Sequence, residues 1–155
     1  MISCSAAKHR SPAGNIPAIE RYDGVLYKVI KKAMRERLAS PLLRVAIISA
    51  KYGLIESSTP IACYDQRMDI NRAKHIAGQV RTCLKQLLAQ YESPQVYISL
   101  GRDYARLVAG LPELKLAIWA NGPIGVRAAA LKKWLIHTGK AAASDAAQPG
   151  VKQRG

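Results

Sequence analysis

Apolar residues recur every three or four positions in four stretches of the sequence, as they do along one face of an amphipathic helix. These stretches are 17–37, 71–91, 124–137 and the shorter 102–109. In the first stretch most of the positions between the apolar ones are basic. The pattern therefore predicts four helices, the first with a basic face formed by Lys28, Lys31, Lys32, Arg35 and Arg37.

Four other stretches are rich in the apolar and β-branched residues that favour strands. Residues 42–49 form an almost continuous apolar run, which is typical of a central strand that is covered on both faces. Residues 1–5, 95–100 and 114–119 are shorter runs of the same kind. Strands that are buried on both faces usually belong to parallel sheets.

Predicted strands and helices alternate along the chain, which is typical of an α/β domain. We expect three αβα layers, with helices on both faces of a mostly parallel four-stranded sheet. Residues 1–139 would form this single α/β nucleic-acid-binding domain, and Gly139 would end its last helix. The remaining residues 140–155 are rich in Ala, Gln and Lys and are expected to be a disordered basic tail.

Functional sites of α/β domains lie where the carboxyl ends of parallel strands meet at one edge of the sheet. Right-handed crossovers would bring residues 3–8, 49–69, 101–104 and 120–125 to that edge. The second of these segments includes an unusually long loop, and loops of that length in a compact domain are commonly functional. Candidate functional residues are therefore sought in these four segments.

The charge of the chain is strongly asymmetric, because 24 Lys and Arg residues stand against 10 Asp and Glu, for a formal net charge of +14. Such a chain attracts polyanions, and DNA is the partner we expect first. Ribosomal proteins and proteins of membrane surfaces can carry the same excess. Because few acids are available to pair with it, the basic face of the first helix is expected to contact the DNA backbone. The alternative is that this face is simply solvated. The residues expected to contact the DNA backbone are Lys28, Lys31, Lys32 and Arg35.

Neither a metal nor a cofactor is predicted. Cys4, Cys63 and Cys83 are far apart and form no Cys-x-x-Cys motif, and the three histidines are equally scattered. No apolar run reaches the roughly 18 residues that cross a bilayer, and the first residues lack the pattern of a signal peptide. We therefore expect a cytoplasmic protein with reduced thiols, no membrane association and no obligate protein partner.

The first of the four segments has features of a phosphate-binding loop. Small side chains, exposed backbone N–H groups and a cation are suited to a phosphate. A tight turn with a surface lysine explains the same residues equally well. The candidate residues are Ser3, Cys4, Ser5 and Lys8.

The long loop combines aromatic residues with a cation. Tyr52 and Tyr64 could stack on a base, and Lys51 could bind its phosphate. Gly53 directly follows this pair of residues and is included in the candidate binding site. We therefore expect the loop to contribute to substrate binding.

Two carboxylates are candidates for the catalytic acid. Asp65 lies in the long loop and could orient water or stabilise a cationic transition state. Its alternative is a helix-terminal acid or a partner for Arg67 or Arg72. Asp103 is the second candidate, although an Asp in a first helical turn also stabilises its own helix. Asp69, just before the second long helix, is expected to cap that helix.

Glycines in the last two segments favour close approach of a ligand to the backbone. Gly101 and Arg102 begin a predicted helix, where backbone N–H groups could bind an anion. Asn121 and Gly122 precede the last helix, and Asn121 could contact a base edge or form a turn. Neither a P-loop nor a GxGxxG motif is present, which disfavours ATP hydrolysis and dinucleotide binding.

Several of these motifs together resemble a family of small bacterial and phage domains of uncharacterised function. That family is in turn similar to the family of the peroxide-stress protein YaaA, which also couples a Ser-x-x-Tyr-Gly turn to a loop with a Pro-Tyr sequence. The resemblance covers roughly residues 1 to 135 and is most specific at Lys51-Tyr52-Gly53-Leu54 and Tyr64-Asp65. The other stretches that carry it are Ile2-Ser3-Cys4-Ser5 with Lys8, Ile48-Ser49-Ala50, Ile61-Ala62-Cys63, Gln66-Arg67-Met68 and Gly122-Pro123-Ile124-Gly125.

This resemblance implies a fold similar to the uracil-DNA glycosylase superfamily and a role in DNA damage or DNA modification. Some small proteins that look like it act in phage defence by removing modified bases from phage DNA. The sequence lacks the Gly-Gln-Asp-Pro-Tyr and His-Pro-Ser motifs of classical uracil-DNA glycosylases, which argues against uracil as the substrate.

We therefore expect a DNA glycosylase that excises a modified base, with Asp65 as the acid and Lys51 as a second catalytic candidate. If Lys51 formed a Schiff base, the enzyme would also be a lyase. Two alternatives stay open. The first is a non-catalytic DNA-binding stress-response protein of the YaaA type, and the second is a hydrolase of small nucleosides or nucleotides, for which the net charge would be in excess.

Overall fold

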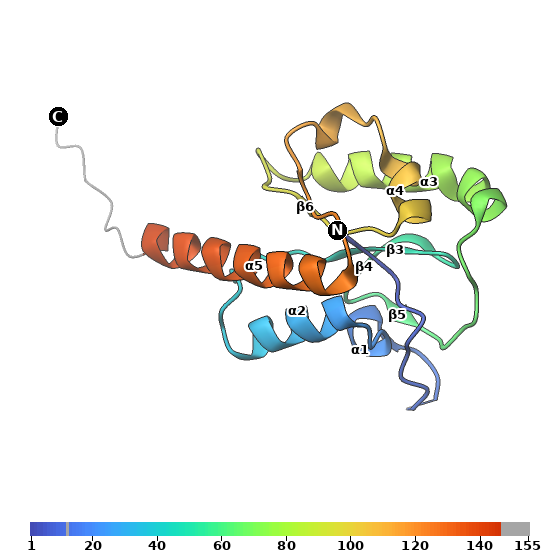
Figure 1. The fold of residues 1–155 in the computed structure, drawn as a ribbon, viewed down its shortest axis with the longest axis horizontal. Coiled ribbons are helices and arrows are strands. Elements are labelled where there is room, and N and C mark those ends of the chain that lie inside the picture. The colour runs from blue at the N-terminus through green and yellow to red at the C-terminus, as the bar shows by residue number, and fades with distance from the viewer. Residues whose placement is uncertain (12, 147–155) are drawn as a thin grey trace.

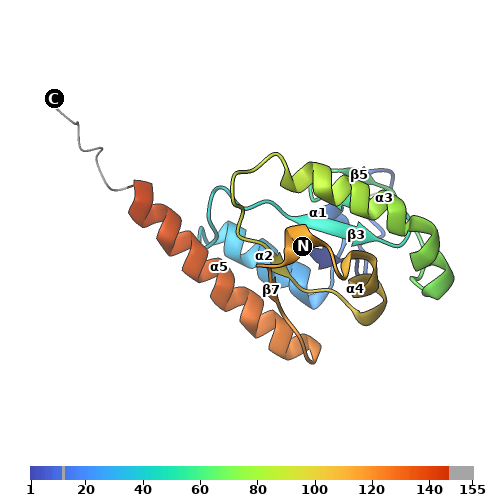
Figure 2. The same ribbon diagram turned by 90° about the horizontal axis from the view of Figure 1, so that it is seen from above.

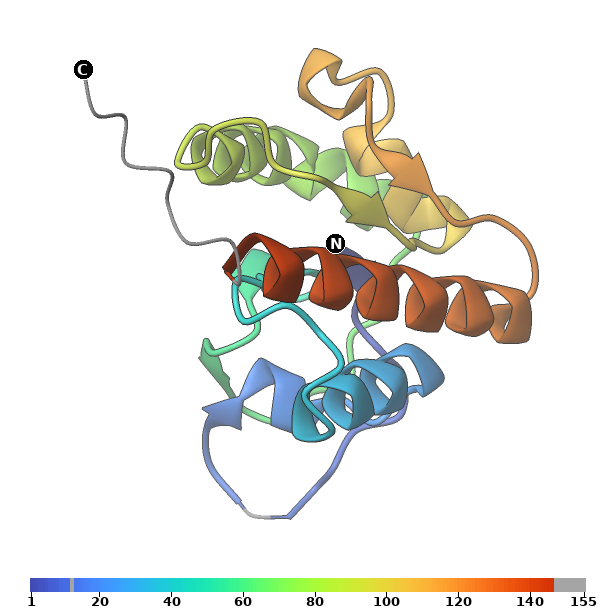
Figure 3. The same cartoon turned by 90° about the vertical axis from the view of Figure 1, so that its left-hand side faces the viewer.

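The computed structural model describes residues 1–11 and 13–146. Figure 1 shows helices α3 (Ile70–Leu88) and α4 (Arg102–Val108) above the strands, and helices α2 (Val25–Arg35) and α5 (Ile124–Ala146) below them. The views in Figures 2 and 3 show the same arrangement from two other sides. The shorter elements are β1 (Ile2–Ser3), β2 (Ile16–Pro17), α1 (Ala18–Arg21), β3 (Ala46–Ser49), β4 (Gly53–Glu56), β5 (Pro60–Ile61), β6 (Tyr97–Ile98), the 3-10 helix η1 (Pro112–Leu114) and β7 (Ile118–Trp119).

Strand β3 lies at the centre of a three-stranded sheet. It pairs in parallel with β1, with Ile2 opposite Ile47, and antiparallel with β4, with Ser49 opposite Gly53. Strands β6 and β7 form a parallel pair, and β2 and β5 form an antiparallel pair. A single bridge between Ile2 and Ser99 places the end of β6 beside β1.

The α/β class is confirmed, whereas the expectation of one mostly parallel four-stranded sheet is wrong. The structure has small sheets of two and three strands, and the longest strand pairing, β3 with β4, is antiparallel. The chain turns back after β3 in only three residues, and Gly53 then takes a positive φ of 74°. Glycine adopts this left-handed conformation without strain, so the long loop begins as a hairpin.

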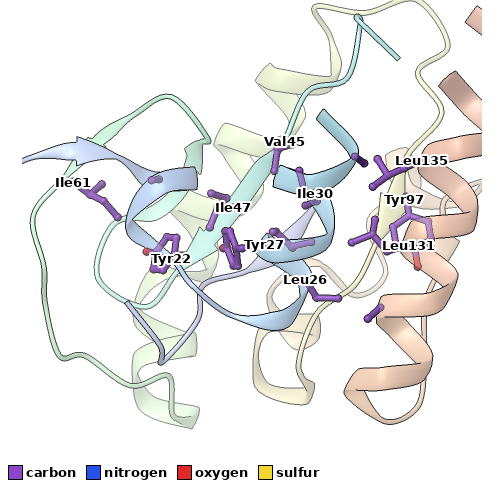
Figure 4. Packing of buried hydrophobic residues seen from close by; sticks show 14 of the residues in the cluster. Tyr22, Leu26, Tyr27, Ile30, Val45, Ile47, Ile61, Tyr97, Leu131 and Leu135 are labelled. Carbon is purple, nitrogen blue, oxygen red and sulfur yellow. The ribbon is translucent and has the colours of Figure 1, made fainter. Parts of the chain in front are cut away.

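Buried side chains form a cluster on each side of β3, because successive residues of a strand point to opposite faces. Ile47 packs into the cluster that contains α2 and α5, and Ile48 packs into the cluster that contains α3 and α4. Figure 4 shows the first cluster, with Tyr27 and Ile47 between the strands and α2. Burial on both faces thus explains the apolar residues 45–48, whereas Leu42, at the start of the predicted strand 42–49, is exposed and lies outside β3.

The predicted first helix, residues 17–37, is interrupted. Helix α1 ends at Arg21, Tyr22 is extended, and α2 begins after Gly24. A methyl group at Gly24 would meet the side chain of Ser5, so the chain passes close to the first loop at this point. Tertiary packing therefore overrides a helical pattern that looks continuous in the sequence.

Two predictions about helix ends have opposite outcomes. Asp69 caps α3 as expected, because its side chain accepts a hydrogen bond from the Arg72 backbone N–H at 2.7 Å. The prediction that Gly139 ends the last helix is wrong, since α5 continues to Ala146. Gly139 instead lies against the backbone of Leu38, where no side chain would fit. Residues 140–146 thus belong to the helix, and residues 147–155 of the expected tail lie outside the described residues.

No helix within the described ranges is both long and apolar enough to cross a membrane.

Candidate functional site

Three hydroxyl groups form a buried chain at the carboxyl end of β3. The Tyr64 hydroxyl lies 2.7 Å from Ser49 Oγ and 2.6 Å from the Tyr22 hydroxyl. Ser49 is the last residue of β3, Tyr22 follows α1, and Tyr64 comes from the long loop after β5. The chain thus joins three segments that are far apart in the sequence.

Ser49 also fixes the turn that follows β3. Its Oγ accepts hydrogen bonds from the backbone N–H groups of Lys51, at 3.2 Å, and Tyr52, at 3.1 Å. A hydroxyl has two acceptor positions and one proton, so Ser49 is left to donate its proton to Tyr64. The turn that carries Lys51 and Tyr52 is therefore tied directly to the hydroxyl chain.

Two lysine amines lie over the aromatic rings of this cluster. Lys8 Nζ is 4.5 Å from the centre of the Tyr64 ring and 5.9 Å from that of Tyr22. Lys51 Nζ is 5.3 Å from the centre of the Tyr52 ring and 5.6 Å from that of Tyr64. In the described part of the chain neither amine has a carboxylate partner. We call Lys8, Lys51, Tyr22, Tyr52, Tyr64 and Ser49 the tyrosine–lysine cluster.

The aromatic rings of the cluster differ in exposure. Tyr64 is only 9% exposed, and the rings of Tyr22 and Tyr52 meet it edge to face at centroid distances of 6.4 and 5.3 Å. Its ring leaves little room for a stacked base, in contrast to our expectation from the sequence. Tyr52 is half-buried and lies beside the amine of Lys51, so it is the more accessible of the two predicted stacking residues.

Arg72 of α3 holds the turn of Lys51 from outside. Its Nε donates to the carbonyl of Ala50 at 2.6 Å, and its Nη2 donates to the carbonyl of Lys51 at 2.9 Å. Two donors from one planar guanidinium define the orientation of the turn. Arg72 therefore positions Lys51 by its backbone.

The loop that carries Lys8 is held by a buried arginine and by an acid. Arg21, whose side chain is fully buried, donates to the carbonyls of His9 and Gly14 at 2.5 and 2.6 Å. The backbone of Lys8 pairs with that of Tyr22 in an isolated antiparallel β-bridge. The Asp23 carboxylate lies 3.3 Å from His9 Nε2. These contacts fasten the loop to α1 and to the start of α2.

Residues 3–5 line the cluster on the side of β1. Cys4 Sγ lies 3.0 Å from the hydroxyl of Tyr104 on α4, and the hydroxyl of Tyr27 donates to the carbonyl of Ser3. Ser5 packs against Gly24. Cys4 thus links the segments 3–8 and 101–104, which the sequence predicted to meet.

Burial keeps the phenol groups of Tyr22, Tyr64 and the neighbouring Tyr104 protonated, because it raises their pKa values. Desolvation raises the pKa of Tyr22 to about 12, and the nearby hydroxyls of Ser49 and Tyr64 oppose part of the rise. Desolvation also raises the pKa values of Tyr64 and Tyr104 well above the usual value of a tyrosine. The buried hydroxyls beside the two lysine side chains are therefore neutral donors and acceptors around neutral pH.

The two candidate acids lie in different surroundings. Asp65 directly follows the buried Tyr64 and is itself exposed, and no hydrogen bond or ion pair holds its carboxylate among the described residues. Asp103 is half-buried in the first turn of α4, where it lines a shallow hollow of about 170 Å³ together with Lys74 and Arg106. The hollow lies between α3 and α4 and is not lined by the tyrosine–lysine cluster.

The remaining predicted binding residues lie apart from the cluster. Gly101 is the residue before α4 and Arg102 is exposed on its first turn, next to the segment that contacts Cys4. Asn121 and Gly122 are exposed in the turn before α5, and no described contact joins them to the cluster. Three of the four segments are thus brought together, and the segment 120–125 is not.

The lysines of α2 have acidic partners, contrary to the premise that few acids are available to them. Lys28 lies 3.4 Å and Lys31 4.0 Å from the Asp23 carboxylate, and Lys32 lies 3.8 Å from Glu36. Arg35, the fourth residue expected on the DNA backbone, is exposed. Lys8 and Lys51, by contrast, have no carboxylate partner among the described residues.

Sequence reasoning missed Tyr22, Ser49 and Arg72 as parts of the site. Ser49 had one signal, because it is the polar end of an apolar strand. Tyr22 and Arg72 had none, since each was assigned to a helix by periodicity. Residues 1–11 and 13–146 contain no group of three or more His, Cys, Asp or Glu side chains that could hold a metal ion.

Comparison with known proteins assigns the chain to a family. A model described as a family of unknown function (DUF6884) matches residues 1–133, which include every residue of the tyrosine–lysine cluster. The chain belongs to this family. A search of the curated proteins finds no match. The similarity to YaaA and to uracil-DNA glycosylases that the motifs suggested stays a prediction.

Proposed function

We propose that this protein is a DNA glycosylase that flips a modified base out of DNA and excises it, leaving an abasic site. The observation that carries the proposal is the position of the two amines of Lys8 and Lys51 over the Tyr64 ring, with no carboxylate partner in the described residues. Unpaired ammonium groups are suited to DNA phosphates, and an accessible aromatic ring beside them is suited to an unstacked base.

Each part of the cluster has a role in this proposal. Lys8 and Lys51 bind the phosphates on either side of the flipped nucleotide, and Tyr52 stacks on its base. Tyr64, Tyr22 and Ser49 support these residues from below, since their hydroxyl chain fixes the turn of Lys51. Backbone groups near Ser3 and Ser5 complete the phosphate contacts.

Asp65 supplies the acid of the reaction. Its carboxylate orients a water molecule toward C1′ of the sugar and stabilises the positive charge that develops there. The water oxygen bonds to C1′ and passes one proton to the Asp65 carboxylate, the bond from C1′ to the base nitrogen breaks, and the base leaves with that proton. An attack by the Lys51 amine in place of water would give a Schiff base and strand cleavage.

Abasic-site labelling of modified DNA tests the proposal. The purified protein is incubated with unmodified, uracil-containing, hydroxymethylated and glucosylated genomic DNA, and aldehyde groups are then labelled. We expect labelling of one modified DNA and its loss in Asp65→Asn. If none of the four DNAs were labelled while binding to them stayed intact, the result would contradict a glycosylase.

Matched variants distinguish between the two candidate catalytic acids, Asp65 and Asp103. Asp103→Asn replaces the other candidate, and Glu92→Gln removes an exposed acid far from the cluster along the chain. Loss of labelling in Asp65→Asn with both other variants active identifies Asp65. Loss in Asp103→Asn alone would transfer the role to Asp103.

A non-catalytic DNA-binding protein is the second candidate, and the exposed, unpartnered carboxylate of Asp65 favours it. General acids and bases are usually held by neighbours, whereas binding needs only the two amines. For this candidate Asp65→Asn leaves binding intact or tightens it. Changing both Lys8 and Lys51 to Met would weaken binding to all DNAs. It would also lower the steepness of the plot of log binding constant against log salt concentration by about 2. Lys132→Met, on the exposed side of α5, removes the same kind of charge and is the control.

A further inference from the structure

The edge of the sheet formed by β7 is apolar and exposed. Of the eleven large hydrophobic residues exposed in the described part of the chain, five lie within residues 116–126. Leu116 is 93% exposed and Ile118 is 51% exposed. We call these five residues the β7 patch: Leu116, Ile118, Trp119, Ile124 and Val126.

Among residues 1–11 and 13–146, the backbone of β7 is paired on one side only. The N–H groups of Ile118 and Ala120 donate at 2.8 Å to the carbonyls of Val96, just before β6, and of Ile98 in β6. Because backbone groups alternate in direction along a strand, the N–H and carbonyl of Trp119 face the opposite, unpaired edge. An unpaired strand edge of this kind can accept a strand of another chain.

Charge indicates which partner can approach this edge. Residues 116–126 contain no Asp, Glu, Lys or Arg, and they form the longest such run in a chain with a net charge of +14. Two copies of a strongly basic protein repel each other over most of their surfaces. The β7 patch itself therefore adds no repulsive charge to a contact between two copies.

The size of the patch fits a small symmetric interface. The exposed surface of its five residues amounts to roughly 500 Å². This area is at the upper end of the apolar patches found on monomeric proteins. Complete burial of the patches of two copies would remove about 1,000 Å² from solvent, the size from which a specific interface is expected.

We propose that the protein forms a homodimer through antiparallel pairing of β7 with β7 of a second copy. A two-fold axis at Trp119 lets the two backbones exchange N–H and carbonyl hydrogen bonds, which joins the sheets of the two copies. The apolar side chains of the patch then pack across the axis. The tyrosine–lysine cluster lies at the ends of β1 and β3 and takes no part in this contact.

Sedimentation velocity of the full chain under reducing conditions tests the dimer. The wild-type protein is expected to pass from monomer to dimer across the micromolar range, without larger species, because a two-fold contact closes on itself. The double variant Leu116→Lys with Ile118→Lys is expected to weaken dimerisation by about tenfold or more, since each charge enters the interface twice. A wild-type monomer throughout the range, or open-ended growth, would overturn the proposal.

Leu42→Lys is the matched control, because Leu42 is 79% exposed and lies outside the patch. It should leave the dimer intact, and thermal unfolding should show that all variants fold. A dimer that survives the changes at Leu116 and Ile118 would also overturn the proposal. The outcome is independent of DNA binding and of base excision.

Discussion

At the scale of single residues, the hydroxyl chain explains how distant segments form one site. Tyr64 is the central member, because it bonds to both Ser49 and Tyr22 within a buried environment. Nothing in the sequence around Tyr64 distinguished stacking on a base from support of a turn. Burial and ring contacts decided for support, and both depend on residues more than ten positions away.

Removal of the Tyr64 hydroxyl should destabilise the fold. Tyr64→Phe keeps the ring and leaves the hydroxyls of Ser49 and Tyr22 without their shared partner, at a cost of about 2 kcal/mol in the free energy of unfolding. Chemical denaturation measures this change in the free energy of unfolding. Tyr91→Phe, at an exposed position, is the control and should change stability by no more than about 0.5 kcal/mol. Equal stabilities of the two variants would contradict the role of the hydroxyl chain.

At the scale of elements, periodicity located the helices α2, α3, α4 and α5, but some helix ends were set by tertiary contacts. The Asp69 cap was predicted because a cap is a local interaction between a side chain and the next turn. The end expected at Gly139 was wrong, because a glycine can also serve as the point where two backbones approach closely. The packing of α5 against the chain after α2 is not encoded in the local pattern around Gly139.

Gly139→Ala tests this close approach. The added methyl group would meet the backbone of Leu38, which has no flexible end that could move away, so a loss of about 2 kcal/mol in stability is expected. Gly125→Ala lies in the same helix with open space around it and should be neutral or stabilising by about 0.5 kcal/mol. If Gly139→Ala were as stable as Gly125→Ala, the contact with Leu38 would not constrain the helix.

At the scale of the whole molecule, burial of the tyrosines connects the core to pH. Tyr22, Tyr27, Tyr64 and Tyr104 have raised pKa values, chiefly through desolvation. The folded state therefore holds these protons more tightly than the unfolded state. Their contribution to stability is complete below the pKa of an unfolded tyrosine, near 10, and is lost as pH rises through about 12 for Tyr22.

An alkaline titration of tyrosinate absorbance should show this difference. In denaturant all seven tyrosines are expected to ionise together near pH 10. In the folded protein the buried ones should stay protonated until the fold gives way, and then ionise in one cooperative step. Circular dichroism on the same samples locates unfolding. Ionisation of all seven near pH 10 with the fold still intact would contradict the buried cluster.

The sequence by itself determined the α/β class, the positions of the main helices and of the central strand, and the excess of positive charge. It also predicted that residues 3–8, 49–69, 101–104 and 120–125 meet, because strand ends in such folds share an edge, and the first three of these segments do. Only the tertiary structure decided that β4 turns back on β3, that Tyr22 joins the site, and that Asp23 neutralises lysines of α2. The physical reason is the distance along the sequence over which each interaction acts. Periodicity, capping and charge are properties of neighbouring residues, whereas strand pairing, burial and ion pairs depend on which distant segments the core brings together.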